Sequence, residues 1–312
     1  MGNIIRFYNQ NRRSIWIFLV IIFFLFILLQ TINYLAGTKQ KNKTQEVNNI
    51  NVSNEENNNI EITSNKSVVS GNALSTTSLK KDTDTIEKFL NYCNNQKIEE
   101  AYNMLTDECK EELYPAKEDF KTYYYGDIFN GEKISFEVEN WINDTYKIDI
   151  VPDMLSTGKS NNGFSKQDYI TVKKVNDEYK LNINNYIGRQ EIKVEKEIDN
   201  VKIKVNYKDV YKEYEKYNLT VENGRDTAIL LDDLNNIDSM YLTDKNDLKY
   251  SAYTHELTKE MLKLSPKENK EIEIKFYSSF VSTKKIRSIV FSKFINYSSN
   301  KEENSQKVVI NL

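Results

Sequence analysis

An unbroken apolar run near the N-terminus constrains this chain more than any other feature. Residues 15–29, IWIFLVIIFFLFILL, are all apolar, and no charge occurs between Ser14 and Thr38. With the milder residues 30–36, the run reaches the roughly 20 residues that a helix needs to cross about 30 Å of hydrocarbon. Backbone groups in lipid must bond internally, so such a segment is helical. The sequence therefore predicts a transmembrane helix over residues 15–36.

An apolar run can also be a buried core helix or a cleaved signal peptide. A buried core helix rarely runs this far without a polar face. A cleaved signal peptide has an apolar region of about 7–15 residues and a small-x-small cleavage site, whereas Tyr34-Leu35-Ala36 puts a bulky side chain where a small one is needed. We therefore expect an uncleaved helix whose partner is the lipid bilayer.

The charges that flank the run set the expected orientation. Arg12 and Arg13 abut it directly, whereas the lysines that follow begin only at Lys39. Basic residues favour the cytoplasmic side, and long downstream domains cross the membrane largely regardless of their charge. We expect residues 1–14 to be a cytoplasmic tail and the bulk of the chain to be extracytoplasmic, as in a single-pass protein of the cell membrane.

A polar stretch follows the apolar run. Residues 37–80 are dominated by Asn, Ser, Thr, Lys and Glu, with too few large apolar side chains to offset the entropy of ordering. We expect a disordered stalk over residues 37–80 and then two folded units, residues 81–188 and residues 189–312.

Helical periodicity opens the first unit. Asp84 and Glu87 form an N-cap and N3 pair that predicts a helix start. The apolar residues that then recur on one helical face are Ile86, Phe89, Leu90 and Cys93. A second short helix is expected over residues 98–105, and Thr106 is placed to cap a third that ends before Pro115.

Strand periodicity completes the first unit and fills the second. Alternating apolar and polar residues predict strands near residues 134–138, 146–150, 169–175, 179–183, 201–207 and 217–221. Asn143-Asp144 and Asn176-Asp177 are turn signals, and Asn223-Gly224 is the strongest hairpin signal in the chain. Further short strands after residue 229 predict a β-sandwich. The expected fold class is α+β: a transmembrane helix, a unit of helices followed by an antiparallel sheet, and an all-β sandwich.

Two stretches of this pattern resemble known families. FLNYCNNQKIEEAYNMLTDECKEEL and YKIDIVPDMLSTG…DYITVKKVNDEYKLNINNYIGR, over about residues 84–188, resemble membrane-anchored Gram-positive bacterial proteins with a nuclear-transport-factor-2-like domain. That resemblance implies a cone-shaped α+β domain whose helices pack into a curved antiparallel sheet. YNLTVENG with MYLTDKND resembles immunoglobulin-like domains of bacterial surface proteins of unknown function. No catalytic motif accompanies either resemblance.

The cone-shaped fold draws attention to four side chains. Its resemblance to steroid isomerases implies that the cavity can host acid–base chemistry, and the candidate cavity-lining residues are Tyr102, Tyr123, Tyr124 and Asp127. Tyrosine and aspartate are common in this chain, and a tyrosine at helical spacing usually serves packing. We therefore favour packing over catalysis at these positions.

The two cysteines allow two interpretations. Cys93 and Cys109 fall in consecutive predicted helices, where they can be small buried apolar side chains. Outside the membrane they can instead form a disulfide between those helices, and closing that loop contributes on the order of 3 kcal/mol.

Residue counts and spacing argue against several chemistries. One histidine and two cysteines are too few for zinc fingers or iron–sulfur clusters. His255 lacks the second histidine of a zinc protease, because Lys259 occupies that position. Gly158-Lys159-Ser160 lacks the first glycine of a phosphate-binding loop, because Asp153 stands there. We expect no catalytic, metal-binding or cofactor-binding residue.

The sequence therefore predicts a bitopic surface protein that binds a partner or braces an assembly. A formal net charge of −3 argues against nucleic acid as that partner, so the expected partner is an envelope protein or the cell wall. The alternatives are an envelope subunit of a conjugation or secretion apparatus, and an enzyme or ligand-binding domain that uses the cavity of the cone-shaped unit.

Overall fold

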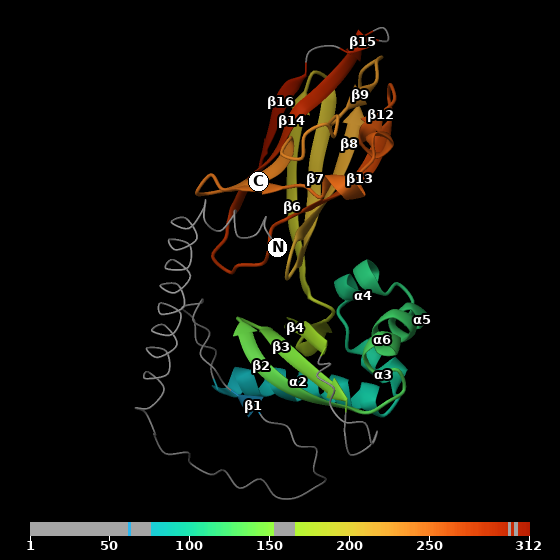
Figure 1. Ribbon diagram of the computed structural model, residues 1–312, viewed down its shortest axis with the longest axis vertical. Coiled ribbons are helices and arrows are strands. Elements are labelled where there is room, and N and C mark those ends of the chain that lie inside the picture. Colours follow the sequence, from blue (N-terminus) through green and yellow to red (C-terminus); the bar gives the residue numbers. More distant parts are fainter. Residues whose placement is uncertain (1–61, 64–75, 153–165, 299–300, 303–304) are drawn as a thin grey trace, which may run out of the picture. The chain divides into compact units, whose positions relative to one another are not determined.

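The computed structural model describes residues 62–63, 76–152, 166–298, 301–302 and 305–312 (Figure 1). Every described residue belongs to one compact unit within residues 58–312. The predicted tail and transmembrane helix, and most of the predicted stalk, lie outside the described residues. Within the described residues, no helix is long and apolar enough to cross a membrane.

Helices come first in the described chain. They are α2 (Thr76–Asn94), α3 (Ile98–Asn103), α4 (Asp107–Leu113), α5 (Lys117–Asp119), the π-helical segment η1 (Phe120–Tyr125) and α6 (Gly126–Ile128). The predicted helix start at Asp84 is wrong, because α2 already begins at Thr76. Leu79 packs on the core and the buried Asp82 accepts a hydrogen bond from Tyr146. These tertiary contacts stabilise helical turns that the polar sequence does not indicate.

The predicted third helix is confirmed together with its cap. Thr106 Oγ1 accepts a hydrogen bond from the Cys109 backbone N–H at 3.0 Å, as an N-cap side chain does. The same residue joins the helix to the sheet, because its backbone N–H donates to Leu181 O.

The first sheet has the strand order β1-β2-β3-β4-β5. Its strands are β1 (Ile62–Thr63), β2 (Ile134–Ile142), β3 (Thr145–Pro152), β4 (Lys166–Val175) and β5 (Glu178–Asn182). β1 pairs with β2 in parallel and the other neighbours are antiparallel. Asn176 and Asp177 both have positive φ, +48° and +65°, which is the conformation of a two-residue hairpin turn. In this sheet the predicted strands and turns are confirmed.

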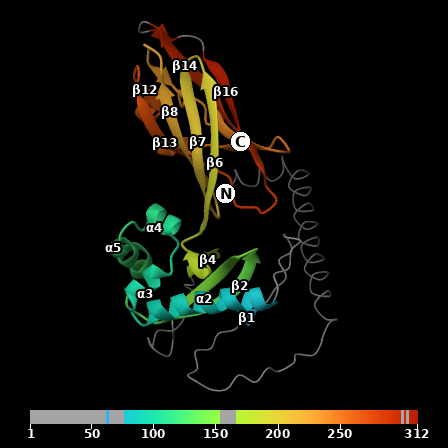
Figure 2. The ribbon, with the colours of Figure 1, turned by 180° about the vertical axis from the view of Figure 1, so that it is seen from behind.

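The helices and this sheet share one apolar core. α2 lies along the sheet (Figure 2), and its buried face contributes Phe89 and Leu90, which meet Ile148 and Ile170 from the strands. The chain is therefore α+β in the predicted order, with helices before antiparallel strands.

Two further antiparallel sheets share a second core. One has the order β13-β8-β7-β6, built from β6 (Tyr186–Ile198), β7 (Val201–Tyr211), β8 (Glu215–Asn223) and β13 (Asn269–Phe276). The other has the order β11-β10-β14-β9-β12, with β15 (Lys301–Glu302) and β16 (Gln306–Asn311) also paired to β14. Its strands are β9 (Ile229–Leu230), β10 (Met240–Asp244), β11 (Lys249–Ser251), β12 (Lys263–Leu264) and β14 (Ile286–Ser298). Two short helices, η2 (Thr254–Glu256) and α8 (Lys259–Leu262), precede β12.

Asn223-Gly224 does not form the predicted hairpin. β8 ends at Asn223, and the next strand, β9, belongs to the other sheet. The buried Asn223 amide instead donates to Thr227 O and Ser265 O. A Cβ on Gly224 would lie 2.7 Å from Asn200 O, so the glycine allows close backbone approach. Long-range contacts, which local propensity does not indicate, decide this turn.

β6 connects the two cores. The expected boundary between residues 188 and 189 falls inside this strand. Tyr186 at its start belongs to the first core, whereas Ile192, Val194 and Ile198 pack against the second. A continuous strand therefore carries the chain from one core to the other.

Candidate functional site

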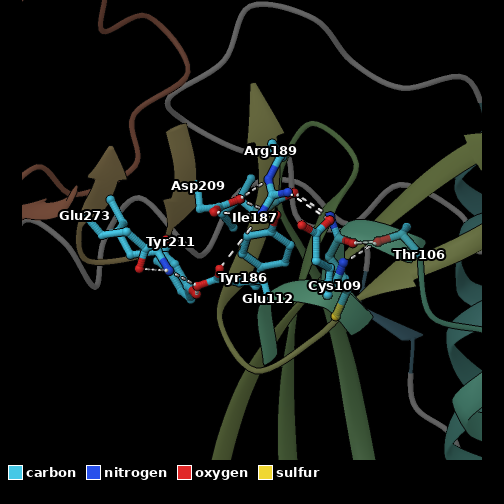
Figure 3. Close-up of polar contacts among 12 residues, drawn as sticks. Thr106, Cys109, Glu112, Tyr186, Ile187, Arg189, Asp209, Tyr211 and Glu273 are labelled. Atoms are coloured by element: carbon cyan, nitrogen blue, oxygen red, sulfur yellow. Dashed lines mark hydrogen bonds and ion pairs between the residues drawn. The ribbon is translucent and has the colours of Figure 1, made fainter. Parts of the chain in front are cut away.

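A cluster of paired charges surrounds Arg189 near the start of β6 (Figure 3). Its Nε and Nη2 donate to Oδ1 and Oδ2 of Asp209 at 2.9 and 3.1 Å. Asp209 is fully buried and stands opposite Arg189 in the register of β6 and β7. Two parallel charge-assisted bonds between planar groups make a strong and directional pair. The pair fixes the guanidinium at the centre of the cluster.

Aromatic side chains hold this pair from two sides. Tyr186 Oη donates to Asp209 Oδ1 at 2.7 Å, and the Arg189 guanidinium lies 3.8 Å from the centre of the Tyr207 ring. Gly188, between Tyr186 and Arg189, has φ +143°, and a Cβ there would lie 3.1 Å from Asn182 Nδ2. The glycine lets the strand carry both side chains into the cluster.

Helix α4 supplies two carboxylates from the first part of the fold. Arg189 Nη1 bonds to Glu111 Oε2 at 3.0 Å, and its Nη2 lies 3.8 Å from Glu112 Oε2. The other oxygen of Glu112 accepts from Tyr211 Oη and lies 2.6 Å from Lys216 Nζ. We call the set Arg189, Asp209, Glu111, Glu112, Tyr186, Tyr211 and Lys216 the junction cluster.

The start of α4 is tied to the same strand that carries Arg189. Thr106, the N-cap of α4, donates to Asn182 Oδ1, and Asn182 Nδ2 donates to Ile187 O at 2.9 Å (Figure 3). Because α4 is held at its N-cap, the carboxylates of Glu111 and Glu112 further along the helix lie at fixed positions. The cluster is thus positioned by a chain of hydrogen bonds from α4 through β5 to β6.

Burial and pairing compete in the junction cluster. Burial lowers the pKa of Arg189 and of Lys216, but their carboxylate partners outweigh it, so the pKa of each is raised. Burial raises the pKa of Glu112, although hydrogen bonds from Lys216 and Tyr211 act in the opposite direction. Burial also raises the pKa of Tyr211, and its contact with Glu112 raises it further. Charges removed from water are stable only when they are paired and hydrogen-bonded. The carboxylates and hydroxyls here bond to one another, an arrangement suited to bracing two parts of a fold.

A second contact joins the same two parts. Trp141 on β2 meets the Tyr169 ring at 4.7 Å and the Phe280 ring at 6.0 Å. Lys212 Nζ lies 4.1 Å from the centre of the Tyr169 ring, and the Phe280 backbone N–H donates to Lys212 O. The part that follows β6 is therefore attached to the first sheet as well as to α4.

The four residues predicted to line a cavity lie in different surroundings. Tyr124 is buried and donates to Asp168 Oδ2 at 2.7 Å, whereas the half-buried Tyr102 donates to Tyr114 O. Tyr123 is 68% exposed, and the exposed Asp127 pairs with Lys166 at 2.7 Å. The structure therefore does not bring these four side chains together.

Aromatic rings fill the space between the helices and the first sheet. Phe120 stacks on Tyr124 with ring centres 5.5 Å apart, and Phe89 and Tyr114 each contact both rings. Contacts of this kind bury large apolar areas and prefer stacked or edge-on geometry. Tyr124 therefore packs, as the sequence indicates, whereas the exposed Tyr123 does not.

Both cysteines of the chain lie in the described part, where their thiols are free and buried. The disulfide between Cys93 and Cys109 is thus not formed in this structure. Burial raises the pKa of the Cys109 thiol to about 12 and raises that of Cys93 as well, which disfavours the reactive thiolate. The two side chains act here as small apolar groups.

Sequence reasoning did not find the junction cluster. Arginine is much rarer than lysine in this chain. That rarity is a weak sign that Arg189 has a specific role. Asp209 shows no such sign, because a charged residue within an alternating strand usually marks the solvent-exposed face. Their pairing depends on strand register and on a helix far away in sequence.

Within the described residues, no group of three or more His, Cys, Asp or Glu side chains is placed to hold a metal ion. His255, the single histidine, has a side chain 64% exposed and lies beside Tyr253. Comparisons of the chain with protein-family models, with curated proteins and with solved structures give no match.

Proposed function

We propose that the chain is a single-pass, membrane-anchored extracytoplasmic binding or scaffolding protein without catalytic activity. The apolar run of residues 15–29 supports the anchor. A cone-shaped module is supported by helices and an antiparallel sheet around one core, and an immunoglobulin-like sandwich by two sheets around a second core. Its partner is an envelope protein or the cell wall.

The junction cluster carries this proposal. Its ionisable groups are engaged with one another, and they link α4 to the sheet that contains β6. Neighbouring modules ordinarily move relative to one another unless the interface between them is large. A buried, paired cluster supports the view that both modules act as one rigid body, which a scaffold needs to set the distance between its partners.

Cell fractionation and protease shaving test the location. With an epitope tag at each end of the full chain, we expect the protein in the membrane fraction. Protease added to intact cells should remove the C-terminal tag and spare the N-terminal one. Full-length protein in the cytosol, or a protected C-terminal tag, would overturn the location.

Crosslinking in intact cells tests the binding role. The full chain should capture a defined set of envelope proteins or cell-wall fragments, and Arg189→Ala should lose part of that set. Arg287→Ala is the matched control, because Arg287 is an exposed arginine paired with Asp247 outside the junction cluster. Circular dichroism of Arg189→Ala separates loss of bracing from loss of folding. Capture of nothing above background by the wild-type chain would refute the proposal.

A further inference from the structure

Next to the junction cluster, where Tyr214 stacks on Tyr211 with ring centres 4.3 Å apart, three tyrosines meet at the surface beside β13. Tyr253 and Tyr277 stack with ring centres 3.6 Å apart and planes 18° apart, and Tyr214 meets Tyr253 edge-on at 6.0 Å. Tyr277 is 46% exposed, and the other two rings are half-buried. We call Tyr214, Tyr253 and Tyr277 the tyrosine shelf.

The shelf is rigid before any ligand arrives. Tyr253 N–H donates to Lys275 O and Tyr277 N–H donates to Ser251 O, which fixes the backbone on both sides of the stack. Lys275 Nζ lies 4.7 Å from the centre of the Tyr214 ring and pairs with Glu256 at 2.8 Å. An aromatic surface held in this way loses little conformational entropy on binding.

The charge and size of this surface favour a neutral polar ligand. Lys275 is paired with Glu256, so its ammonium group is already neutralised and offers a phosphate backbone no unpaired positive charge. In the described segment between Tyr277 and the start of β14, Val281 is the other exposed large apolar side chain. Two such side chains provide little of the apolar centre around which a stable protein interface is built.

A sugar ring fits a surface that has an exposed aromatic face and paired charges. One face of a pyranose carries C–H bonds, which pack on the negative face of an aromatic ring. Its hydroxyls need hydrogen-bond partners. The exposed His255, whose ring centre lies 5.6 Å from that of Tyr253, and the adjacent Glu256 offer such groups. Tyr277 offers the exposed ring, and Tyr253 supports it from behind.

We propose that the tyrosine shelf binds a neutral polysaccharide, with Tyr277 as the stacking residue. This inference rests on the proposed binding function and names a surface and a ligand class for it.

Calorimetric titration of the full chain tests the site. The probes are cellotetraose, chitotetraose and maltotetraose, each taken to millimolar concentration, in a detergent without a sugar head group. We expect saturable binding of at least one probe, weakened about tenfold by Tyr277→Ala, which corresponds to about 1.4 kcal/mol. Tyr277→Trp should retain binding. Tyr123→Ala is the matched control, because Tyr123 is exposed but lies on η1, and it should leave the affinity unchanged.

Three results would overturn the assignment: no binding of any probe, equal binding by Tyr277→Ala, or a photo-crosslinker at position 277 that labels a protein and no glycan. If the wild-type chain still captures envelope partners in cells, failure of the titration removes the sugar site alone. If that capture fails while the titration succeeds, the sugar site stands and the envelope-partner role falls.

Discussion

The two cores of this protein are built differently. In the first, buried tyrosines direct their hydroxyls at buried carboxylates: Tyr124 at Asp168 and Tyr146 at Asp82, with bonds of 2.7 and 2.9 Å. The second core also has such a bond, from Tyr217 Oη to the buried Glu215 at 2.8 Å, but is otherwise mainly aliphatic, with phenylalanines such as Phe291 among leucines, isoleucines and valines. A hydroxyl–carboxylate bond accepts a narrow range of geometry, whereas aliphatic packing depends chiefly on volume. The arrangement of the first core therefore depends more on polar bonds, and that of the second core depends more on the shapes of its side chains.

The junction cluster lies where these two designs meet. Tyr186 and Tyr211 extend the tyrosine–carboxylate arrangement to the first strands of the second part, with ring centres 5.2 Å apart. Asp209 and Glu112 are their acceptors. Polar bonds therefore connect the cores at this cluster, beside the aromatic contact of Trp141 with Phe280.

The largest effect is expected at this connection. Arg189→Ala leaves the fully buried Asp209 without its guanidinium, and breaking a buried pair in this way costs about 3–5 kcal/mol. The free energy of unfolding, from urea titration followed by circular dichroism, should fall by that amount. Arg287→Ala, which removes an exposed pair, should change it by less than about 1 kcal/mol. Equal losses in the two variants would show that the cluster does not brace the fold.

A smaller effect is expected inside the first core. Tyr146→Phe removes the donor to Asp82, which is 3% exposed. Leaving a buried acceptor unpaired costs about 1–3 kcal/mol, and urea titration should show that loss. Tyr123→Phe, at an exposed ring, should leave stability unchanged. If Tyr146→Phe left the free energy of unfolding unchanged, the first core would depend on side-chain volume, as the second does.

The second core should respond less to a change of similar size. Ile274→Val removes one methylene from a fully buried side chain, which typically costs about 0.5–1.5 kcal/mol. Thermal unfolding should register a correspondingly small fall in Tm. A loss larger than that of Tyr146→Phe would reverse the comparison between the two cores.

The smallest effect is a pH dependence near the second core. Asp232 is fully buried, and its Oδ2 has no hydrogen-bond partner among the described residues. Burial raises its pKa above the ordinary 3.8. The folded state therefore keeps this proton to a higher pH than the unfolded state does. The stability that this group contributes is present below pH 3.8 and is lost as the pH rises through the raised pKa.

Asp232→Asn removes that titration. The unfolding free energy of the wild type minus that of the variant should fall as the pH rises from 3.8, and urea titrations of both proteins across this range measure it. A difference that is constant with pH would contradict the assigned proton. Ser239→Ala, which removes a hydroxyl donor to the other oxygen of Asp232, should steepen the fall.

Local patterns predicted most of the elements. Period-two alternation located β2 and β3, because each strand buries one face. Asn176-Asp177 predicted its turn because asparagine and aspartate tolerate positive φ. The prediction for Thr106 succeeded because a cap depends on the next three residues alone. The start of α2 and the role of Gly224 were mispredicted, since packing against distant residues decides both.

The sequence by itself determined the order of helices before antiparallel strands, the capping of α4 and the packing role of Tyr124. These follow from the spacing of neighbouring residues. Only the tertiary structure decided that Arg189 meets Asp209 and Glu111, that Cys93 and Cys109 are buried thiols, and that Tyr253 stacks on Tyr277. The physical reason is that these contacts join residues far apart in the chain, so their energies arise from the register of strands and from packing between elements, which local spacing does not encode.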